Sequence, residues 1–520
     1  MAMVVLFLTK ATGVKSPPIN KVNLNDTTAI VNIPNNLEIR GLIRESPIPV
    51  IKCADNINQQ SDKVAYLVSQ IIDRQALKKQ NQSGVEYVRM NSKIMQEAIR
   101  DYDIYLNWMV ENGILDCDPK YVPGEHSRGY KLRIKYQLKG IKNHVITYPV
   151  LVKRLKNGKI DTHSKQSYPM LLQDLQSLTI ENYKGLIEET NIGKYKQLAY
   201  SSSKAEILEE NKIRGKKSLF FGMYEKKLKN AIHQRAINKI SSWQNALSKI
   251  HEKQFYFNQD KTSFRLHTSA VSVKKELRRH LRVNGERLVA CDIKNSQPYF
   301  SVGLLLNPIK FKKLVSGQIS HYQGTELDWV YKGVTNMLVK FQSRDLLDST
   351  LKYIDLVSTG KFYEFMADEL QKLTNKPWTR EAAKKEVFKV FFNPPRFKRN
   401  PARKIMGENF PEVLRFFSLI NYGFKKTKGQ TKNLSNYKGN SFARILQRME
   451  SQTVLDLICV DLKEMYPNIP LITLHDGIAT TVGNQYLVKE SMECILEKEV
   501  GIKGIVEIEL KKWGIEKYPH

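Results

Sequence analysis

Two aspartates close short apolar runs and have the chemistry to hold catalytic metal ions. Asp292 lies in "RLVACDI", and Asp476 follows His475 in "LITLHDG". An unpaired charge inside a buried strand is costly, so each strand should reach the surface where its carboxylate lies. Two such carboxylates can hold two magnesium ions about 4 Å apart, which activate a hydroxyl and stabilise a leaving pyrophosphate. Substrate phosphates complete magnesium coordination, so we expect two Mg²⁺ ions on this pair, with Mn²⁺ as an alternative.

A third segment carries residues suited to a nucleotide. "TREAAKKEVFKVFFNPP" predicts a helix capped by Thr379 and stopped before Pro394. Positions four apart lie on roughly one face of a helix. The residues at this spacing are Arg380, Lys384, Phe388 and Phe392. Two cations followed by aromatic rings fit the phosphates and the base of a nucleoside triphosphate. A basic amphipathic helix with phenylalanines in the core is the alternative.

The composition indicates a polyanionic partner. Lysine and arginine number 83 against 52 acidic residues, a net charge of +31. Nucleic acid is the simplest partner for such an excess, and a solvated basic surface is the alternative. The 5 cysteines form no C-x-x-C pair, so neither a zinc ribbon nor a disulfide framework is indicated. The opening "MAMVVLFLTK" is too short to span a membrane and predicts an edge strand. We expect a soluble, cytoplasmic protein without a membrane partner.

The elements before the aspartates predict two further regions. "SDKVAYLVSQIIDRQALKK" has helical periodicity, with Ser61 or Asp62 as its cap. Two helices from residue 91 to about 113 precede two predicted strands joined by "PGEHSR". Helices followed by a basic hairpin resemble a winged helix-turn-helix; an ordinary α+β accessory domain is the alternative. Residues 165–255 predict basic helices with interleaved aromatics, which suit phosphate contacts and base stacking.

The order of the three motifs resembles motifs A, B and C of the family A (DNA polymerase I-like) polymerases. The Asp292 strand, the R-x-x-x-K-x-x-x-F helix and the His-Asp strand follow in that order. The related single-subunit phage-type RNA polymerases share this core. The resemblance covers residues 255–520 and includes "FRLHTSAVSVKKELRRHL", "LVSTGKFYEFMADEL" and "ARILQRMESQTVLDLICVDL".

This resemblance implies an α+β right-hand fold. Its palm holds an antiparallel sheet, and its fingers and thumb are helical. Residues 1–150 would form the accessory domain, for which a winged helix is one interpretation. Residues 151–255 would form a basic, helical, thumb-like region, and residues 256–520 the palm and fingers.

The family's functional residues can be carried over where its motifs match. The resemblance implies that Asp292 and Asp476 bind the metals and that Lys384 also donates a proton to pyrophosphate. The residues implied to bind the incoming nucleotide are Arg380, Lys384, Phe388, Phe392 and Gln297. The residues implied to contact the template-primer are Arg265, Arg278 (or Arg279), Gln452 (or Gln447) and His475.

Three departures from the family pattern bear on sugar choice and fidelity. The DNA enzymes carry a glutamate gate against the ribose 2′-hydroxyl where this chain has Gln297. A glutamine can still block that hydroxyl, which favours deoxynucleotides. Gly477 replaces an acid after the His-Asp pair, and Phe392 replaces a tyrosine. Nothing in the first 250 residues resembles the family's proofreading exonuclease.

The sequence therefore predicts a template-directed nucleotidyltransferase, most simply a DNA polymerase without proofreading. Its partners would be a DNA or RNA template-primer and nucleoside triphosphates. An RNA polymerase, a primase, a reverse transcriptase and a defence-system polymerase remain open on the same core. A replication initiator or regulator with a vestigial palm is the non-enzyme alternative. The Lys-, Asn- and Ile-rich chain suits a phage or mobile element in a bacterial host.

Overall fold

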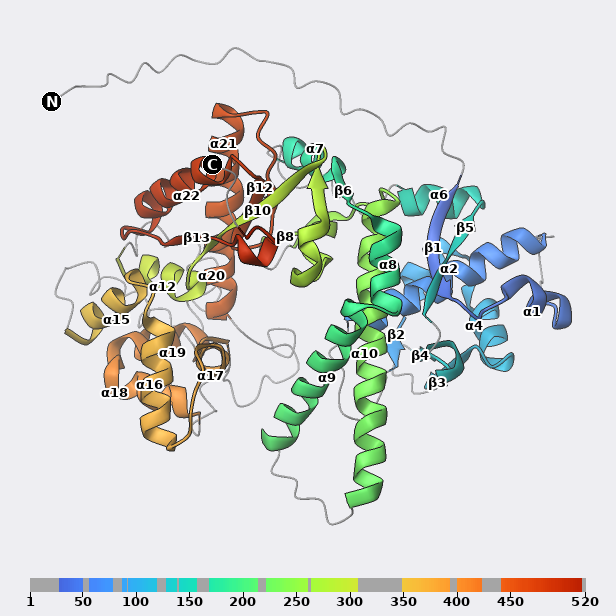
Figure 1. The fold of residues 1–520 in the computed structure, drawn as a ribbon, viewed down its shortest axis with the longest axis horizontal. Helices are drawn as coiled ribbons and strands as arrows, with labels where there is room; N and C mark the ends of the chain where they lie inside the picture. The colour runs from blue at the N-terminus through green and yellow to red at the C-terminus, as the bar shows by residue number, and fades with distance from the viewer. Residues whose placement is uncertain are drawn as a thin grey trace, which may run out of the picture. The chain divides into compact units, whose positions relative to one another are not determined.

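The chain folds into two compact units of mixed helix and sheet. The computed structural model (Figure 1) describes residues 28–49, 56–77, 87–90, 92–118, 128–137, 140–156, 168–213, 221–260, 263–306, 348–392, 400–422 and 441–516. One unit comprises residues 1–75 and 86–156, and the other residues 76–85 and 157–520. The edge strand expected at the N-terminus lies outside the described residues.

The first unit holds a two-stranded ribbon and a three-stranded sheet, surrounded by helices. Strand β1 pairs antiparallel with β5, and the other sheet has the order β2-β4-β3. Its elements are β1 (Ala29–Pro34), α1 (Ile39–Glu45), α2 (Ile57–Leu77), β2 (Val88–Arg89), α3 (Ser92–Ala98), α4 (Tyr102–Glu111), β3 (Leu115–Asp118), β4 (Gly129–Leu132), α5 (Ile134–Gln137), β5 (Ile141–Ile146) and α6 (Pro149–Lys156). The helix pair lies where the sequence predicts it. The second predicted strand, "GYKLRIKY", is only partly confirmed, because β4 stops at Leu132 and the short helix α5 follows.

Helix α4 is the second helix of that pair, the one that a helix-turn-helix places in the major groove. Its inner side buries Tyr105 and Trp108, among others. Its exposed residues are Asp103, Asn107 and Glu111. Carboxylates on this face repel phosphates, so the exposed side of α4 does not favour docking on nucleic acid.

Helix α2 starts earlier than the sequence predicts, and its expected cap has another role. The Asn56 side chain accepts a hydrogen bond from the Gln59 N–H at 2.9 Å, so Asn56 caps the helix. Asp62 lies one turn inside α2 and is almost fully buried. Its carboxylate accepts hydrogen bonds from the backbone N–H groups of Thr147 (2.7 Å) and Tyr148 (2.9 Å). Asp62 therefore ties α2 to the junction between β5 and α6.

We expect Asp62→Asn to destabilise the first unit at pH 7 by about 2 kcal/mol, because hydrogen bonds to a charged acceptor are lost. Burial alone would raise the pKa of Asp62, but hydrogen bonds from His144, Thr147 and Tyr148 hold the pKa below its usual value. A lowered pKa stabilises the fold above the unfolded-state value, about 3.9, and this contribution is lost as the pH falls through the folded-state value. Hydrogen exchange at residues 147–148 of the full chain, compared between pH 7 and about pH 2, measures both effects.

Asp103→Asn, at an exposed position of the same unit, is the control for that measurement. It should leave exchange at residues 147–148 unchanged. Equal exchange in the native and Asp62→Asn proteins at pH 7 would contradict the prediction.

The second unit is built on a six-stranded sheet whose central strand is β10. The main path runs β11-β12-β10-β9-β6, and β13 pairs with β10 as well. Its strands are β6 (Leu178–Ile180), β9 (Leu281–Val283), β10 (Glu286–Ile293), β11 (Ile472–Thr473), β12 (Gly477–Thr481) and β13 (Val506–Ile508). A separate pair consists of β7 (Phe257–Gln259) and β8 (Leu266–Thr268). All these pairings are antiparallel.

Helices cover this sheet and form a lobe beside it (Figure 1). The helices near the sheet are α7 (Pro169–Gln176), α11 (Ser269–Ser272), η1 (Lys275–His280), α12 (Ser296–Leu306), α20 (Ser441–Ser451), η4 (Gln452–Ile458), α21 (Cys459–Met465), α22 (Gln485–Val500) and η5 (Lys511–Trp513). The lobe consists of α15 (Asp348–Ser358), α16 (Phe362–Thr374), α17 (Arg380–Phe392), α18 (Pro401–Asn409) and α19 (Pro411–Tyr422). Its core is rich in aromatic rings, and it packs against α12 and α20.

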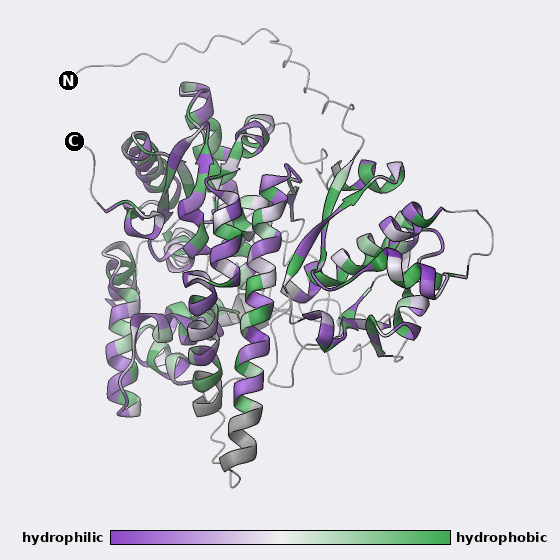
Figure 2. Cartoon of the chain, turned by 45° about the vertical axis from the view of Figure 1, so that its right-hand side comes forward, coloured by the Kyte–Doolittle hydropathy of each residue, from purple (hydrophilic) through white to green (hydrophobic). Residues whose placement is uncertain are grey.

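The basic helical region contains α8 (Tyr183–Asn191), α9 (Lys194–Ile213) and α10 (Phe221–His251). Helices α9 and α10 pack against each other, and hydrophilic and hydrophobic residues alternate along α10 (Figure 2). Trp243 of α10 and Val289 of β10 belong to one hydrophobic core. The region also contributes strand β6, which the sequence does not predict. Within the described ranges, no helix is long and apolar enough to cross a membrane.

Candidate active site

The two predicted metal-binding aspartates lie on neighbouring strands. Asp292 on β10 is paired with Gly477, which follows Asp476 at the start of β12. The Ile293 N–H donates to the Asp476 carbonyl at 3.1 Å, so the two backbones are in contact. A Cβ at position 477 would lie 3.0 Å from both the Asp292 Oδ1 atom and the Cys291 carbonyl oxygen. This crowding explains why glycine, and no acid, follows Asp476.

The His-Asp pair does not end a strand as expected. Strand β11 stops at Thr473, and His475 and Asp476 form the tight turn into β12, closed by a bond from the Leu474 N–H to the Gly477 carbonyl at 2.8 Å. A two-residue hairpin turn requires a positive φ angle at its first central residue, and His475 has φ 69°. An adjacent His-Asp pair also occurs in metal-dependent phosphohydrolases, where it lies on a helix; here it lies in a turn, which does not fit that interpretation.

The surroundings of the aspartates are crowded with charge. Burial raises the pKa of Asp292 well above its usual range, and the charges of Asp476 and Glu509 raise it further. Arg278 faces the same three carboxylates, although burial lowers the pKa of its guanidinium. Sequence reasoning missed Glu509, which follows strand β13 and pairs with Lys512. Carboxylates that lie close together and are partly buried repel one another, so a cation bound beside them is strongly favoured.

This donor set fits the expected magnesium ions. Asp292 and Asp476 offer carboxylate oxygens, the ligands that magnesium prefers, and a cation would relieve their mutual repulsion. In the part of the chain that the structure describes, no group of three or more His, Cys, Asp or Glu side chains is placed to hold a metal ion by itself. A magnesium site completed by substrate oxygens needs no such group.

Helix α17 brings its predicted nucleotide-binding residues towards Asp292. As predicted, the helix is capped by the Thr379 hydroxyl, which accepts from the Ala382 N–H at 3.2 Å. Arg380 donates to the Asn295 side chain at 2.9 Å, and Asn295 lies in the turn just after Asp292. Arg380 also donates to Glu364 at 2.9 Å. The turn after Asp292 and the start of α17 are therefore joined by a direct hydrogen bond.

The remaining residues of this face pack around one buried ring. Lys384 Nζ lies 5.8 Å from the ring centroid of Tyr363 and 5.6 Å from that of Phe388. Phe388 and Phe392 lie 4.9 Å apart and pack against the core. Tyr363 is fully buried, its hydroxyl has no hydrogen-bond partner, and the charges of Arg380 and Asp476 both act on it. Arg380 of α17 and Asp476 therefore both lie near enough to Tyr363 for their charges to act on it.

Two residues expected to face the substrates are instead tied to a buried glutamate. Glu450 of α20 is completely buried and accepts hydrogen bonds from Arg265, Ser296 and Gln297. The resemblance placed the palm-helix contact at Gln452 or Gln447, and both of these side chains are half-buried. Glu450 was missed because a buried acid has no signature in a single helical segment.

His475 sits close to this group. Its ring makes an edge contact with His267, with the centroids 5.4 Å apart, and its Nδ1 atom is buried without a partner. Burial, together with the charges of Arg265, His267 and Arg278, lowers the pKa of His475 to about 4. The ring is therefore neutral at physiological pH and can act as a hydrogen-bond donor or acceptor but not as a cation.

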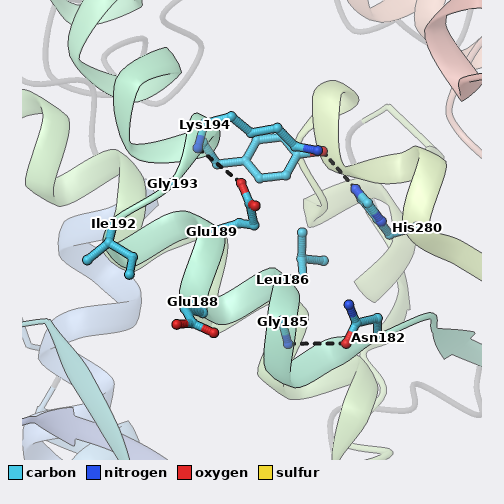
Figure 3. Close-up of a pocket in the computed structure, with 10 residues that line it drawn as sticks. Asn182, Gly185, Leu186, Glu188, Glu189, Ile192, Gly193, Lys194 and His280 are labelled. Carbon is cyan, nitrogen blue, oxygen red and sulfur yellow. Dashed lines mark hydrogen bonds between the residues drawn. The ribbon is translucent and has the colours of Figure 1, made fainter.

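A separate pocket lies between α8, the start of α9 and η1 (Figure 3). His280 lines it and accepts or donates a hydrogen bond with the Tyr195 hydroxyl at 2.7 Å. Glu189 closes one side by accepting from the Lys194 N–H at 3.0 Å. None of the predicted site residues lines this pocket.

The chain is similar to known proteins at the level of structure. No model of a protein family matches the chain, and no curated protein matches it. Among solved structures, the chain is similar to the POL domain of Pol1 from M. smegmatis in complex with a DNA primer-template and dNTP. The identity is 10%, the match covers 69% of this chain and 70% of that chain, and the TM-score is 0.34. Function is therefore inferred from this chain's own residues.

Proposed function

We propose that this chain is a template-directed nucleotidyltransferase, most simply a DNA polymerase without proofreading. This proposal rests on one observation: two carboxylates that are far apart in the sequence lie beside each other and next to the basic helix α17. Asp292 and Asp476 lie on paired strands, and Asn295 bonds Arg380 of α17 immediately beside them. Paired carboxylates next to a cation-bearing helix are the parts that nucleotidyl transfer requires.

Magnesium ions on Asp292 and Asp476 would supply activation of the attacking 3′-hydroxyl and stabilisation of charge on the leaving pyrophosphate. Arg380 and Lys384 would bind the triphosphate, because both cations lie over the same ring, that of Tyr363, at 5.5 and 5.8 Å from its centroid. Lys384 would also donate a proton to the pyrophosphate. Phe388 would lie beside the sugar and base, and Phe392 beside the templating position.

The template-primer would lie across the basic surfaces of the second unit. Helices α9 and α10 would act as the thumb by contacting phosphates. Arg278, beside the carboxylates, and His475, in the turn, would approach the primer terminus. Gln452 is the first residue of the π-helical segment η4. Such segments are often found at functional sites, and Gln452 would approach the template from there.

Incorporation of nucleotides in magnesium tests the proposal. The native protein would be offered primed and unprimed DNA and RNA templates with dNTPs or rNTPs. We expect primer extension that copies the template, and the productive combination would name the subclass of polymerase. If no combination gives incorporation while DNA binding is intact, the enzyme is excluded and a nucleic-acid-binding initiator or regulator remains.

Arg380→Ala is expected to raise the KM for the incoming nucleotide roughly 30-fold, the equivalent of about 2 kcal/mol for a lost charge-assisted contact. Steady-state extension at varied nucleotide concentration measures this change. Lys389→Ala is the control, since Lys389 lies on the same helix and pairs with Glu386. Glu364→Gln should lower the KM instead, because it removes a carboxylate that competes with phosphate for Arg380. A KM that stays unchanged in Arg380→Ala would contradict the assigned role.

A further inference from the structure

Glu450 connects three separate segments of the second unit. Its Oε2 atom accepts hydrogen bonds from the Ser296 hydroxyl at 2.5 Å and from Gln297 Nε2 at 2.6 Å. Its Oε1 atom accepts from Arg265 Nε at 2.9 Å and also from the Arg265 Nη2 atom. Both carboxylate oxygens of this α20 residue are therefore used, by one residue just before β8 and by two at the start of α12.

The carboxylate is expensive to bury, so its partners are held firmly. Glu450 is completely buried, and burial together with the charge of Asp476 raises its pKa, whereas Arg265 and Ser296 lower it. A buried charge that keeps its partners fixes their geometry, because losing any one leaves a polar group unpaired. The electrostatic influence of Asp476 also shows that this network adjoins the candidate active site.

Gln297 depends on Glu450 for its orientation. Only 6% of the Gln297 side chain surface is exposed, and its Oε1 atom is buried without a hydrogen-bond partner. The bond from Nε2 to Glu450 is thus the polar contact that determines which way the amide faces. Gln297 opens α12 five residues after Asp292, at the position where sugar discrimination is expected.

We propose that Glu450 is a positioning residue for sugar selection: it fixes the orientation of the Gln297 amide. The inference rests on the proposed nucleotidyltransferase function and adds to it a residue from a different helix. With the amide fixed, the side chain cannot turn aside for a 2′-hydroxyl. With Glu450 neutralised, the amide is free to turn, and ribonucleotides are admitted more readily.

The test compares the kcat/KM ratio of dNTP over rNTP in the native protein and in variants. Glu450→Gln keeps the size of the side chain but removes the charge, and we expect the ratio to fall about tenfold or more. Gln297→Glu alone places two carboxylates in contact and should be poorly folded or inactive. The double variant Gln297→Glu/Glu450→Gln restores an amide–carboxylate pair with reversed polarity, so both stability and sugar ratio should recover.

Glu464→Gln is the matched control, since Glu464 is exposed on α21, which follows α20 and η4 in the chain. Thermal unfolding of the two single variants and the double variant gives a coupling between positions 297 and 450 that does not depend on activity. Coupling without any change of the sugar ratio in Glu450→Gln would show a structural role only and overturn the proposal. Equal use of both sugars by the native protein would overturn it as well. No incorporation of either sugar by the native protein would instead defeat the proposed function.

Discussion

Asp476→Asn should reduce nucleotide incorporation by roughly 10³-fold or more, because it removes a charge that acts on the transition state. The fold should be retained, since asparagine has the same shape and tolerates the hairpin turn. The backbone bond from Ile293 to the Asp476 carbonyl does not involve the side chain. Primer extension under saturating magnesium and nucleotide measures the loss.

A second measurement ties this loss to metal binding. Titration with Mn²⁺, followed by its paramagnetic resonance signal, should show weaker binding in Asp476→Asn than in the native protein. Asp355→Asn is the control, because Asp355 is exposed on α15. It should keep native incorporation and native metal binding. Full incorporation by Asp476→Asn would rule out a catalytic role for this carboxylate.

The local parts of the site could be predicted from the sequence because their signals are local. Thr379 and the prolines after Phe392 delimit α17, and the structure gives Arg380–Phe392. The apolar run around Asp292 predicts β10 for a similar reason. A cap, a helix breaker and an apolar run act within a few residues, so a single sequence carries them.

The parts that connect distant segments could not be predicted. Glu450 and Gln297 are separated by 153 positions, and nothing near Glu450 marks it as a buried acceptor. Glu509 joins the carboxylates only because β13 pairs with β10. The turn at His475 was predicted as a strand end because it takes only two residues, His475 and Asp476, of which only His475 has a positive φ. The apolar pattern of the flanking strands continues on both sides of so short a turn.

The segment that leads into the His-Asp turn depends on a buried ion pair with α7. Lys463 Nζ lies 2.6 Å from the Asp174 carboxylate, and the exposed fractions of the two side chains are only 4% and 14%. Lys463 also donates to the Ile469 carbonyl at 2.7 Å, and Asp174 accepts from the Leu471 N–H at 2.8 Å. The pair therefore fixes the chain immediately before β11, and with it the position of Asp476.

Lys463→Met is accordingly expected to lower the free energy of unfolding by about 3–5 kcal/mol, since it leaves the Asp174 carboxylate buried without its cation. Adding Asp174→Asn should recover part of the loss, because the amide keeps an acceptor for the Leu471 N–H without a charge. Denaturant unfolding of the full chain measures both variants. Lys404→Met removes the exposed pair with Glu408 and should cost less than about 1 kcal/mol.

The pH dependence gives an independent check: burial already raises the pKa of Asp174 against the opposing effect of Lys463. Without Lys463 that pKa rises further, so the variant should approach native stability as the pH falls and lose it again as the pH rises through the raised value. Equal losses in Lys463→Met and Lys404→Met at neutral pH would mean that this pair does not hold the turn in place.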